Sequence, residues 1–149
     1  MAISVPVTGG CACGAIRYEC TAEPLFTWKC HCRDCQRSTG GGAAVNVVFS
    51  KSDVQFTKGA PKEHASTGTT GQQTHRGFCA ECGSPISARA DRILDIRGIS
   101  AASLDDPGQI ELVAHIWTAS AQPWDELSAR LAQFETTPTE AELQTLASH

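Results

Sequence analysis

Seven of the eight cysteines in the sequence fall into three short groups. The groups are "CAC" (Cys11, Cys13), "CHCRDC" (Cys30, Cys32, Cys35) and "CAEC" (Cys79, Cys82). One C-x-x-C pair alone would be weak evidence for a site. Zinc, however, is held tetrahedrally by thiolate and imidazole ligands, and close cysteine pairs on turns can supply two ligands each. The arrangement of two, three and two cysteines therefore indicates metal binding.

The two outer pairs predict one closed metal site. In both pairs the second cysteine precedes a glycine, Gly14 or Gly83, which permits a tight backbone turn beneath a metal at no steric cost. Together the two pairs complete a tetrahedron of thiolates, so no coordination position stays open. We expect this zinc to be structural and to join the N-terminal strand to a hairpin far along the chain.

The middle group supplies three ligands and leaves a fourth position open. Three protein ligands plus an exchangeable fourth is the arrangement of a catalytic zinc. The alternative is a second closed site, completed by Cys20, His31, His75 or His115. Cys20 lies on the apolar face of an expected strand and is predicted to be a buried, inert thiol. His31 lies between two ligands and is predicted to point to solvent.

An open zinc held by three thiolates is a soft, sulfur-rich site, which suits another sulfur ligand. Zinc favours the deprotonated form of a thiol that it binds, so the fourth ligand could be a thiol substrate. Lys29, Arg33 and Arg37 could offset the negative charge of the site or bind a carboxylate of the thiol, or they could be ordinary surface charges. The run "STGGGAA" could hold an anionic group on its backbone N–H groups, or it could be only a tight turn.

Several other functions fit the sequence less well. A thioredoxin-like role for "CRDC" needs a pair of cysteines free of metal, whereas a third cysteine lies nearby. The net charge of -4 and the scattered basic residues argue against a nucleic-acid partner. The N-terminus "MAISVPVTGG" has neither a basic region nor a long apolar run, so we expect no signal peptide and no membrane anchor. Clustered thiols without such a signal indicate a reducing compartment, the cytoplasm.

The length of 149 residues and the 41% hydrophobic content predict one soluble domain spanning residues 1–149. Short segments rich in β-branched and aromatic residues, separated by glycine and proline, predict a mainly β fold of antiparallel sheets. The expected strands are 15–20, 43–49, 53–57, 85–90, 93–99 and 110–118. Short C-terminal helices are expected next. Leu127, Leu131 and Phe134 lie at helical spacing, and Thr137 and Glu140 could form a capping box around Pro138.

At this point the sequence resembles the glutathione-dependent formaldehyde-activating family, which includes relatives of centromere protein V. The residues that carry the resemblance are "GGCACGAIRY", "CHCRDCQRSTG", "GFCAECGSPI", "IRGISAASLDDP" and "HIWTASAQPW". They extend from Gly9 to Trp124, in the order found in the family. The resemblance implies a β-tent fold with two zinc ions per chain. The structural zinc would be held by Cys11, Cys13, Cys79 and Cys82, and the catalytic zinc by Cys30, Cys32 and Cys35.

The resemblance also implies an activity, which is the formation of S-hydroxymethylglutathione from glutathione and formaldehyde by a carbon-sulfur lyase. Zinc would hold the thiolate of glutathione beside the aldehyde. The segment 51–73, an expected part of the pocket wall, matches no glutathione-binding pattern. Two alternatives are a zinc-stabilised binding or interaction module without turnover, and a redox or metal-buffering protein. The sequence does not predict the oligomeric state.

Overall fold

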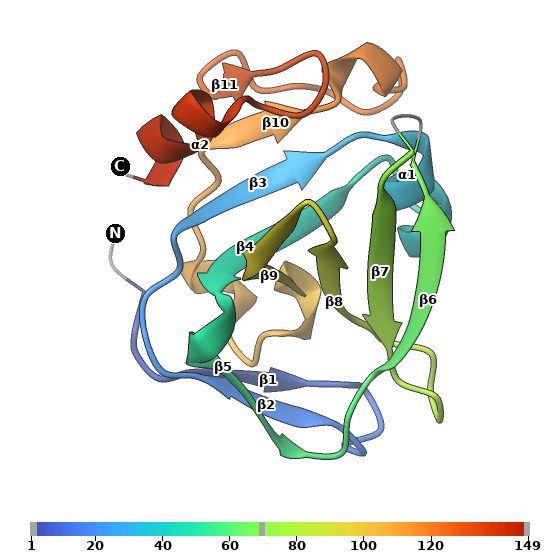
Figure 1. Ribbon diagram of the computed structural model, residues 1–149, viewed down its shortest axis with the longest axis vertical. Coiled ribbons are helices and arrows are strands. Elements are labelled where there is room, and N and C mark those ends of the chain that lie inside the picture. The colour runs from blue at the N-terminus through green and yellow to red at the C-terminus, as the bar shows by residue number, and fades with distance from the viewer. Residues whose placement is uncertain (1–2, 69–70, 148–149) are drawn as a thin grey trace.

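The computed structural model describes residues 3–68 and 71–147 of the chain (Figure 1). Over these residues the fold is mainly β, as the sequence predicted, with a small sheet, a large sheet and two short α-helices. The helices are α1 (Arg33–Thr39) and α2 (Glu140–Ala147). Short 3-10 turns occupy Lys51–Asp53, Ala101–Ser103, Pro107–Gln109 and Thr118–Ser120.

The small sheet is antiparallel and has the strand order β1-β2-β5. Its strands are β1 (Val7–Gly10), β2 (Arg17–Cys20) and β5 (Val54–Lys58). In β2 the side chains of Tyr18 and Cys20 are buried, whereas Arg17 and Glu19 on the opposite face are only partly buried. This alternation agrees with the expected strand 15–20, on whose apolar face Cys20 was placed, and it turns one face of the small sheet toward the core.

The large sheet has the order β11-β10-β3-β4-β9-β8-β7-β6. Its strands are β3 (Phe26–Cys30), β4 (Ala44–Ser50), β6 (Lys62–Thr67), β7 (Gln73–Phe78), β8 (Pro85–Ala90), β9 (Ile93–Ser100), β10 (Ala114–Ile116) and β11 (Ala132–Gln133). From β3 to β6 all neighbours are antiparallel. The short strand β10 is parallel to both β3 and β11 and is an exception to the expected antiparallel pairing.

The two faces of the large sheet have different uses. Successive strand residues point to opposite faces, so β4 sends Val47 and Phe49 to one side and Asn46 and Val48 to the other. Val47 and Phe49 belong to the main hydrophobic core, which also contains Tyr18 of the small sheet. Asn46 and Val48 line a cavity on the opposite face. The main core therefore lies between the two sheets, and the other face carries both the cavity and a smaller hydrophobic cluster that includes Val48 and Leu146 of α2.

The prediction of a helix around Leu127, Leu131 and Phe134 is wrong. These residues lie in an extended loop whose only regular element is β11. The backbone N–H of Phe134 donates to the carbonyl of His115, and that of Ala132 donates to Val113. Because the backbone donors are used by the β10 region, the apolar spacing does not lead to a helix.

The final helix begins two residues later than the sequence predicted. The N–H of Glu142 donates to Thr139 Oγ1 at 3.3 Å, and the N–H of Thr139 donates to the Glu142 carboxylate at 2.7 Å, which together form a capping box. Thr137, the expected cap, instead accepts a hydrogen bond from the indole N–H of Trp117. The expected strand 110–118 is likewise shortened, to β10. At the C-terminal end the strand stops before Trp117, which has a left-handed backbone conformation with φ 57°.

Candidate functional site

The first cysteine cluster joins the end of β1 to the turn that follows β7. The sulfur atoms of Cys11, Cys13, Cys79 and Cys82 all lie within 4.8 Å of one another. Cys13 Sγ is 3.6 Å from Cys11 Sγ and 3.8 Å from Cys79 Sγ. A tetrahedron with metal–sulfur bonds of about 2.3 Å has sulfur–sulfur edges of about 3.8 Å. The cluster therefore has the dimensions of a four-thiolate zinc site.

Tight turns at two glycines bring the cysteines of this cluster together. Gly14 and Gly83 have φ of 79° and 78°, a left-handed conformation that glycine adopts without a Cβ clash. Ser84 also links the two cysteine pairs of this cluster. Its hydroxyl accepts the N–H of Ala12, between Cys11 and Cys13, and contacts Cys82 Sγ at 3.1 Å. Hydrogen bonds from Ser84 lower the pKa of the Cys82 thiol to about 5. This cluster can hold a metal ion with protein ligands alone, as a structural site does.

The second cluster lies at the junction of β3 and α1. Cys30 ends β3, Cys32 is the N-cap of α1, and Cys35 lies in its first turn. The Cys32 thiol group accepts the backbone N–H of Cys35 at 3.3 Å, so the cap of the helix is itself a sulfur ligand. The three sulfur atoms lie within 4.8 Å of one another. This local geometry follows from the C-x-C-x-x-C spacing across a strand end and a helix start.

Among the described residues, no fourth cysteine, histidine or acidic side chain joins this second cluster. Cys20 is fully buried in the main core, as the sequence predicted. His75 contacts Asp91 at 2.9 Å, and His31 and His115 contact each other at 2.9 Å. The closed alternative for the second site therefore finds no protein ligand. His31 is fully buried, so the prediction that it points to solvent is wrong.

The three sulfur atoms do not share charge equally. Hydrogen bonds from the thiols of Cys30 and Cys35 lower the pKa of the Cys32 thiol to about 2, and the N–H of Cys35 and the charge of Arg76 act in the same direction. The thiols that donate these bonds are harder to ionise, and the pKa of Cys30 is raised well above its ordinary value. A thiolate at Cys32 is thus available to a metal ion, because the thiolate is the form that binds metal.

Arg76 of β7 is the cation that touches this cluster. Its Nη2 atom lies 3.6 Å from Cys35 Sγ, and its Nη1 donates to Ser66 Oγ at 3.0 Å. Other cations lie closer to the cluster in sequence but have other surroundings. Lys29 pairs with Asp125, Arg33 donates to Gln36, and Arg37 is exposed on α1. Arg76 was missed because it is distant in sequence from the second cluster, and no local spacing relates it to Cys30, Cys32 or Cys35.

The second cluster lies in the wall of a cavity of about 440 Å³ on the open face of the large sheet. The wall near the cysteines is aromatic and aliphatic, with Trp28, Ile116 and Trp117, and further strands add Phe78 and Ile96. Its charged side chains are Arg76, Arg89 and Arg92, with His64 as a further basic group and no acidic residue among the described lining. The segment 51–73 was expected to line the pocket, but of its described residues only His64 does so, and β7 to β9 provide most of the wall. The cavity suits an apolar or anionic small molecule.

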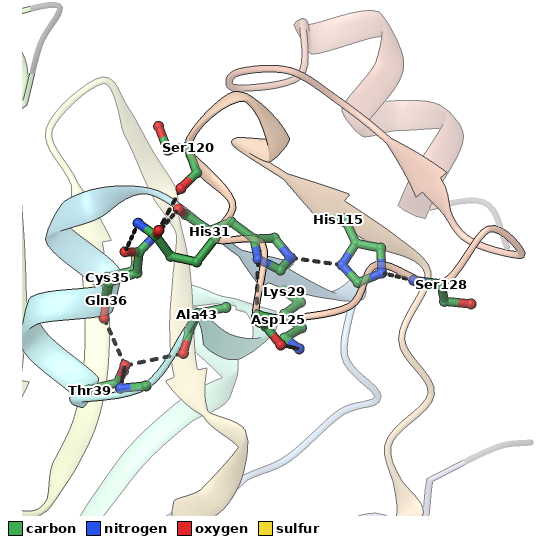
Figure 2. Close-up of polar contacts among 12 residues, drawn as sticks. Lys29, His31, Cys35, Gln36, Thr39, Ala43, His115, Ser120, Asp125 and Ser128 are labelled. Atoms are coloured by element: carbon green, nitrogen blue, oxygen red, sulfur yellow. Dashed lines mark hydrogen bonds and ion pairs between the residues drawn. The ribbon is translucent and has the colours of Figure 1, made fainter.

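A buried polar network supports the second cluster from behind (Figure 2). His31 Nε2 contacts His115 Nδ1, and the N–H of Ser128 donates to His115 Nε2 at 3.0 Å. The side-chain amide of Gln36 donates to the carbonyls of His31 and Ser120 at 2.7 and 3.0 Å. These contacts tie the loop between Cys30 and Cys32 to the segment that follows β10.

The glycine run after α1 is a turn in this structure. Gly40 has φ 76° and ends α1, and its N–H donates to the carbonyl of Gln36. A Cβ at Gly42 would lie 2.5 Å from the Asp125 carboxylate, so only glycine fits against that side chain. Close packing against Asp125, rather than an anion, explains this glycine.

None of the helices in 3–68 and 71–147 combines the length and the apolar character needed to cross a bilayer. The fold and the two clusters define a β protein with one four-cysteine and one three-cysteine site, each able to hold a metal ion such as zinc. The sequence model of the family described as glutathione-dependent formaldehyde-activating enzyme matches residues 6–120. The chain belongs to this family.

Two individual proteins are similar to the chain. A Halomonas elongata protein, provisionally named a glutathione-dependent formaldehyde-activating enzyme, is 27% identical over 131 residues, which cover 82% of this chain and 81% of that protein. A Rhodobacter sphaeroides protein of known crystal structure is 21% identical, with a TM-score of 0.53, over 85% of this chain and 98% of that one. At that identity the second likeness supports the fold alone.

Proposed function

We propose that the chain is a zinc-dependent carbon-sulfur lyase-type enzyme. It forms an S-hydroxymethyl adduct, or a close analogue, from a thiol such as glutathione and formaldehyde or a related aldehyde. The observation that carries the proposal is the second cysteine cluster, which finds no fourth ligand among the described residues and lines a cavity of about 440 Å³. An open position in a cavity is what a substrate thiol needs, and the family membership supports the same reaction.

The seven clustered cysteines would hold two zinc ions in one domain of residues 1–149. Cys30, Cys32 and Cys35 would be the catalytic ligands. Cys11, Cys13, Cys79 and Cys82 would be the structural ones. When bound by three thiolates, zinc supplies an open position for a fourth thiolate and lowers the pKa of the thiol that takes it.

The overall reaction needs a thiolate and a polarised carbonyl. The sulfur bonds to the carbonyl carbon, the electron pair of the C=O π bond moves to oxygen, and that oxygen takes a proton from water. Arg76 is suited to the negative charge that develops on oxygen. A guanidinium has five N–H donors, and two of those of Arg76 are used by Ser66 and Cys35. The other N–H groups are available in a partly apolar cavity, where a hydrogen bond to an anion is strong.

The proposal is tested by comparing glutathione with S-methylglutathione, which keeps the peptide but cannot form a thiolate. Calorimetry of the zinc-loaded protein in two buffers of different ionisation enthalpy measures affinity and proton release together. Glutathione should bind more tightly and release a proton near neutral pH, because a free thiol has a pKa of about 8.5. Formation of the formaldehyde adduct, followed by NMR exchange, should then be accelerated by the protein. Equal affinities without proton release would favour the binding module.

A further inference from the structure

His31 lies between two cysteines of the second cluster, yet its side chain faces away from them into a closed set of hydrogen-bonding groups. The ring is fully buried, and that of His115 is only 3% exposed. Figure 2 shows the order of contacts from the N–H of Ser128 through His115 to His31 and Asp125. Two polar atoms in this set, His31 Nδ1 and Asp125 Oδ2, are buried without a hydrogen bond within ordinary geometry. The question is which nitrogen of each ring carries a proton.

The backbone N–H of Ser128 determines which ring nitrogen of His115 carries the proton. A backbone N–H always donates, so His115 Nε2, which faces the N–H of Ser128 at 3.0 Å, must be a bare acceptor. A neutral imidazole carries one proton, which must then lie on Nδ1. His115 Nδ1 is 2.9 Å from His31 Nε2, so His115 donates to His31.

The tautomer of His31 follows from that of His115. Its Nε2 accepts from His115, so its own proton lies on Nδ1. That nitrogen is 3.5 Å from Asp125 Oδ2, the other buried atom without a partner. The two orphan atoms are therefore a donor and an acceptor that face each other. The second oxygen of Asp125 is 3.2 Å from Lys29 Nζ, so the carboxylate is held in place from its other side.

With both rings neutral, only one placement of the two ring protons satisfies these hydrogen bonds. If the proton of either neutral ring moved to Nε2, two donors would face each other somewhere between Ser128 and His31. The main chain of His31 is fixed as well, because its N–H donates to Ile116 at 2.9 Å and its carbonyl accepts from Gln36 at 2.7 Å. All three polar groups of His31 are therefore held by partners outside the Cys30–Cys32 loop.

We infer that His31 is the positioning residue of the three-cysteine site. It is held as the Nδ1–H tautomer by the hydrogen bonds from Ser128 through His115 to its Nε2 and by the Asp125 carboxylate that faces its Nδ1. It fixes the peptide between Cys30 and Cys32 and hence the direction in which both sulfur atoms point. The inference rests on the proposed function only in taking these cysteines as metal ligands. Partners that orient ligands in this way typically change metal affinity by roughly 10- to 100-fold when removed.

The first test is a long-range 1H–15N correlation spectrum of the zinc-loaded protein labelled at its histidine nitrogens. The shifts of bare and protonated ring nitrogens are well separated, so the spectrum identifies each tautomer directly. Both His31 and His115 should show a protonated Nδ1 and a bare Nε2. An Nε2–H tautomer, an imidazolium or exchange averaging at either ring would overturn the inference. This test needs no substitution and does not depend on activity.

The second test uses His115→Phe, which keeps a ring but removes both hydrogen bonds. Metal should leave the three-cysteine site roughly 10- to 100-fold faster, while release from the four-cysteine site stays unchanged. That second site in the same molecule reports any general loss of stability. His75→Phe is the matched control, because it removes a histidine that contacts Asp91 at the surface. Equal acceleration at both sites, or none at either, would overturn the positioning role, and absence of metal from the three-cysteine site in the unsubstituted protein would count against the proposed function instead.

Discussion

The Nη2 atom of Arg76 lies 3.6 Å from the Sγ atom of Cys35, so a partly buried cation from β7 touches the sulfur cluster built by β3 and α1. Within the described residues, its other hydrogen-bond partner is the neutral hydroxyl of Ser66. Burial lowers the pKa of the Arg76 guanidinium, but the charge of the cluster and the hydrogen bond to Cys35 together outweigh it, so the net pKa is raised. A cation in this place offsets the negative charge of the cluster and favours a further anion beside it.

Replacing Arg76 with Gln should therefore weaken the binding of a thiolate substrate. A hydrogen bond to a charged group contributes about 1.5 to 3 kcal/mol, which corresponds to roughly ten- to a hundredfold in Kd. Arg76→Lys should lose less, because the charge remains although the forked donor geometry does not. Calorimetric titration with glutathione gives the Kd of Arg76→Gln, Arg76→Lys and the unsubstituted protein.

Arg89→Gln is the control for this experiment. Arg89 lines the same cavity, but its guanidinium is already bound to the Glu63 carboxylate at 2.8 and 2.9 Å. Removing it should change thiol affinity much less than removing Arg76. Equal losses from the two substitutions would mean that the general charge of the cavity matters, and not the contact with Cys35.

The contact between Arg76 and Cys35 also shows which parts of the site could be predicted from the sequence. Metal ligands that share a turn are close whatever the fold, so the groups around Cys13, Cys32 and Cys82 were recognisable from spacing alone. Arg76 reaches Cys35 only because β6 and β7 bring it across the large sheet. The "QTHRGF" segment of β7 lacks the apolar alternation that identifies a strand, so neither the strand nor its arginine was expected.

The wrong predictions have a related cause. The surroundings of His31 are set by His115, 84 residues away, and no local pattern reports that pairing. The apolar spacing of Leu127, Leu131 and Phe134 is compatible with a helix, but backbone bonding to the β10 region overrides it. Local spacing predicted which cysteines lie together and the strands β2, β4, β5, β8, β9 and β10, but not β1, β3, β6 or β7. Long-range pairing determined the cavity and its charges.

Cys79→Ser and Cys32→Ser should have different consequences. Cys79 is buried in the core. Its sulfur atom lies 3.8 Å from that of Cys13, which is in the turn between β1 and β2. Its loss should remove the bridge between β1 and β7 and destabilise the whole fold, since binding of a structural metal contributes directly to folding. Cys32→Ser should leave a folded protein that does not accelerate adduct formation. Melting curves and circular dichroism compare the two, and equal destabilisation would indicate that both sites are structural.

Arg17 and Asp105 should make stability depend on pH in the acid range. The two Arg17 nitrogens donate to the carboxylate at 2.8 and 2.5 Å, and Thr8 donates to it as well, which lowers the pKa of Asp105 to about 2. A pKa lowered on folding contributes stability at pH values above the unfolded pKa of about 3.9, and this contribution is lost as the pH falls toward the folded value. Because both side chains are exposed by more than a third, Asp105→Asn should cost no more than about 1 kcal/mol.

The free energy of urea unfolding, measured for Asp105→Asn and the unsubstituted protein between pH 7 and pH 3, checks this prediction. The difference between the two proteins should be constant above about pH 5 and should narrow below about pH 4. Asp106→Asn is a neighbouring control, because no ion pair is recorded for Asp106 in the part of the chain that the structure describes. A difference that persists unchanged to pH 3 would mean that the pairing does not control the ionisation of Asp105.

Mild chelation should remove the two metal ions in sequence. The four-cysteine cluster offers a complete tetrahedron of thiolates, whereas the three-cysteine cluster has one ligand fewer and lines an open cavity. The zinc of the second cluster should therefore leave first, and adduct formation should stop while the circular dichroism spectrum stays that of the folded protein. The first zinc should leave later, together with cooperative unfolding, because its removal separates β1 from the turn after β7. Zinc release, activity and ellipticity followed in one titration measure this order, and loss of both ions in a single step with concurrent unfolding would contradict the division into a catalytic and a structural site.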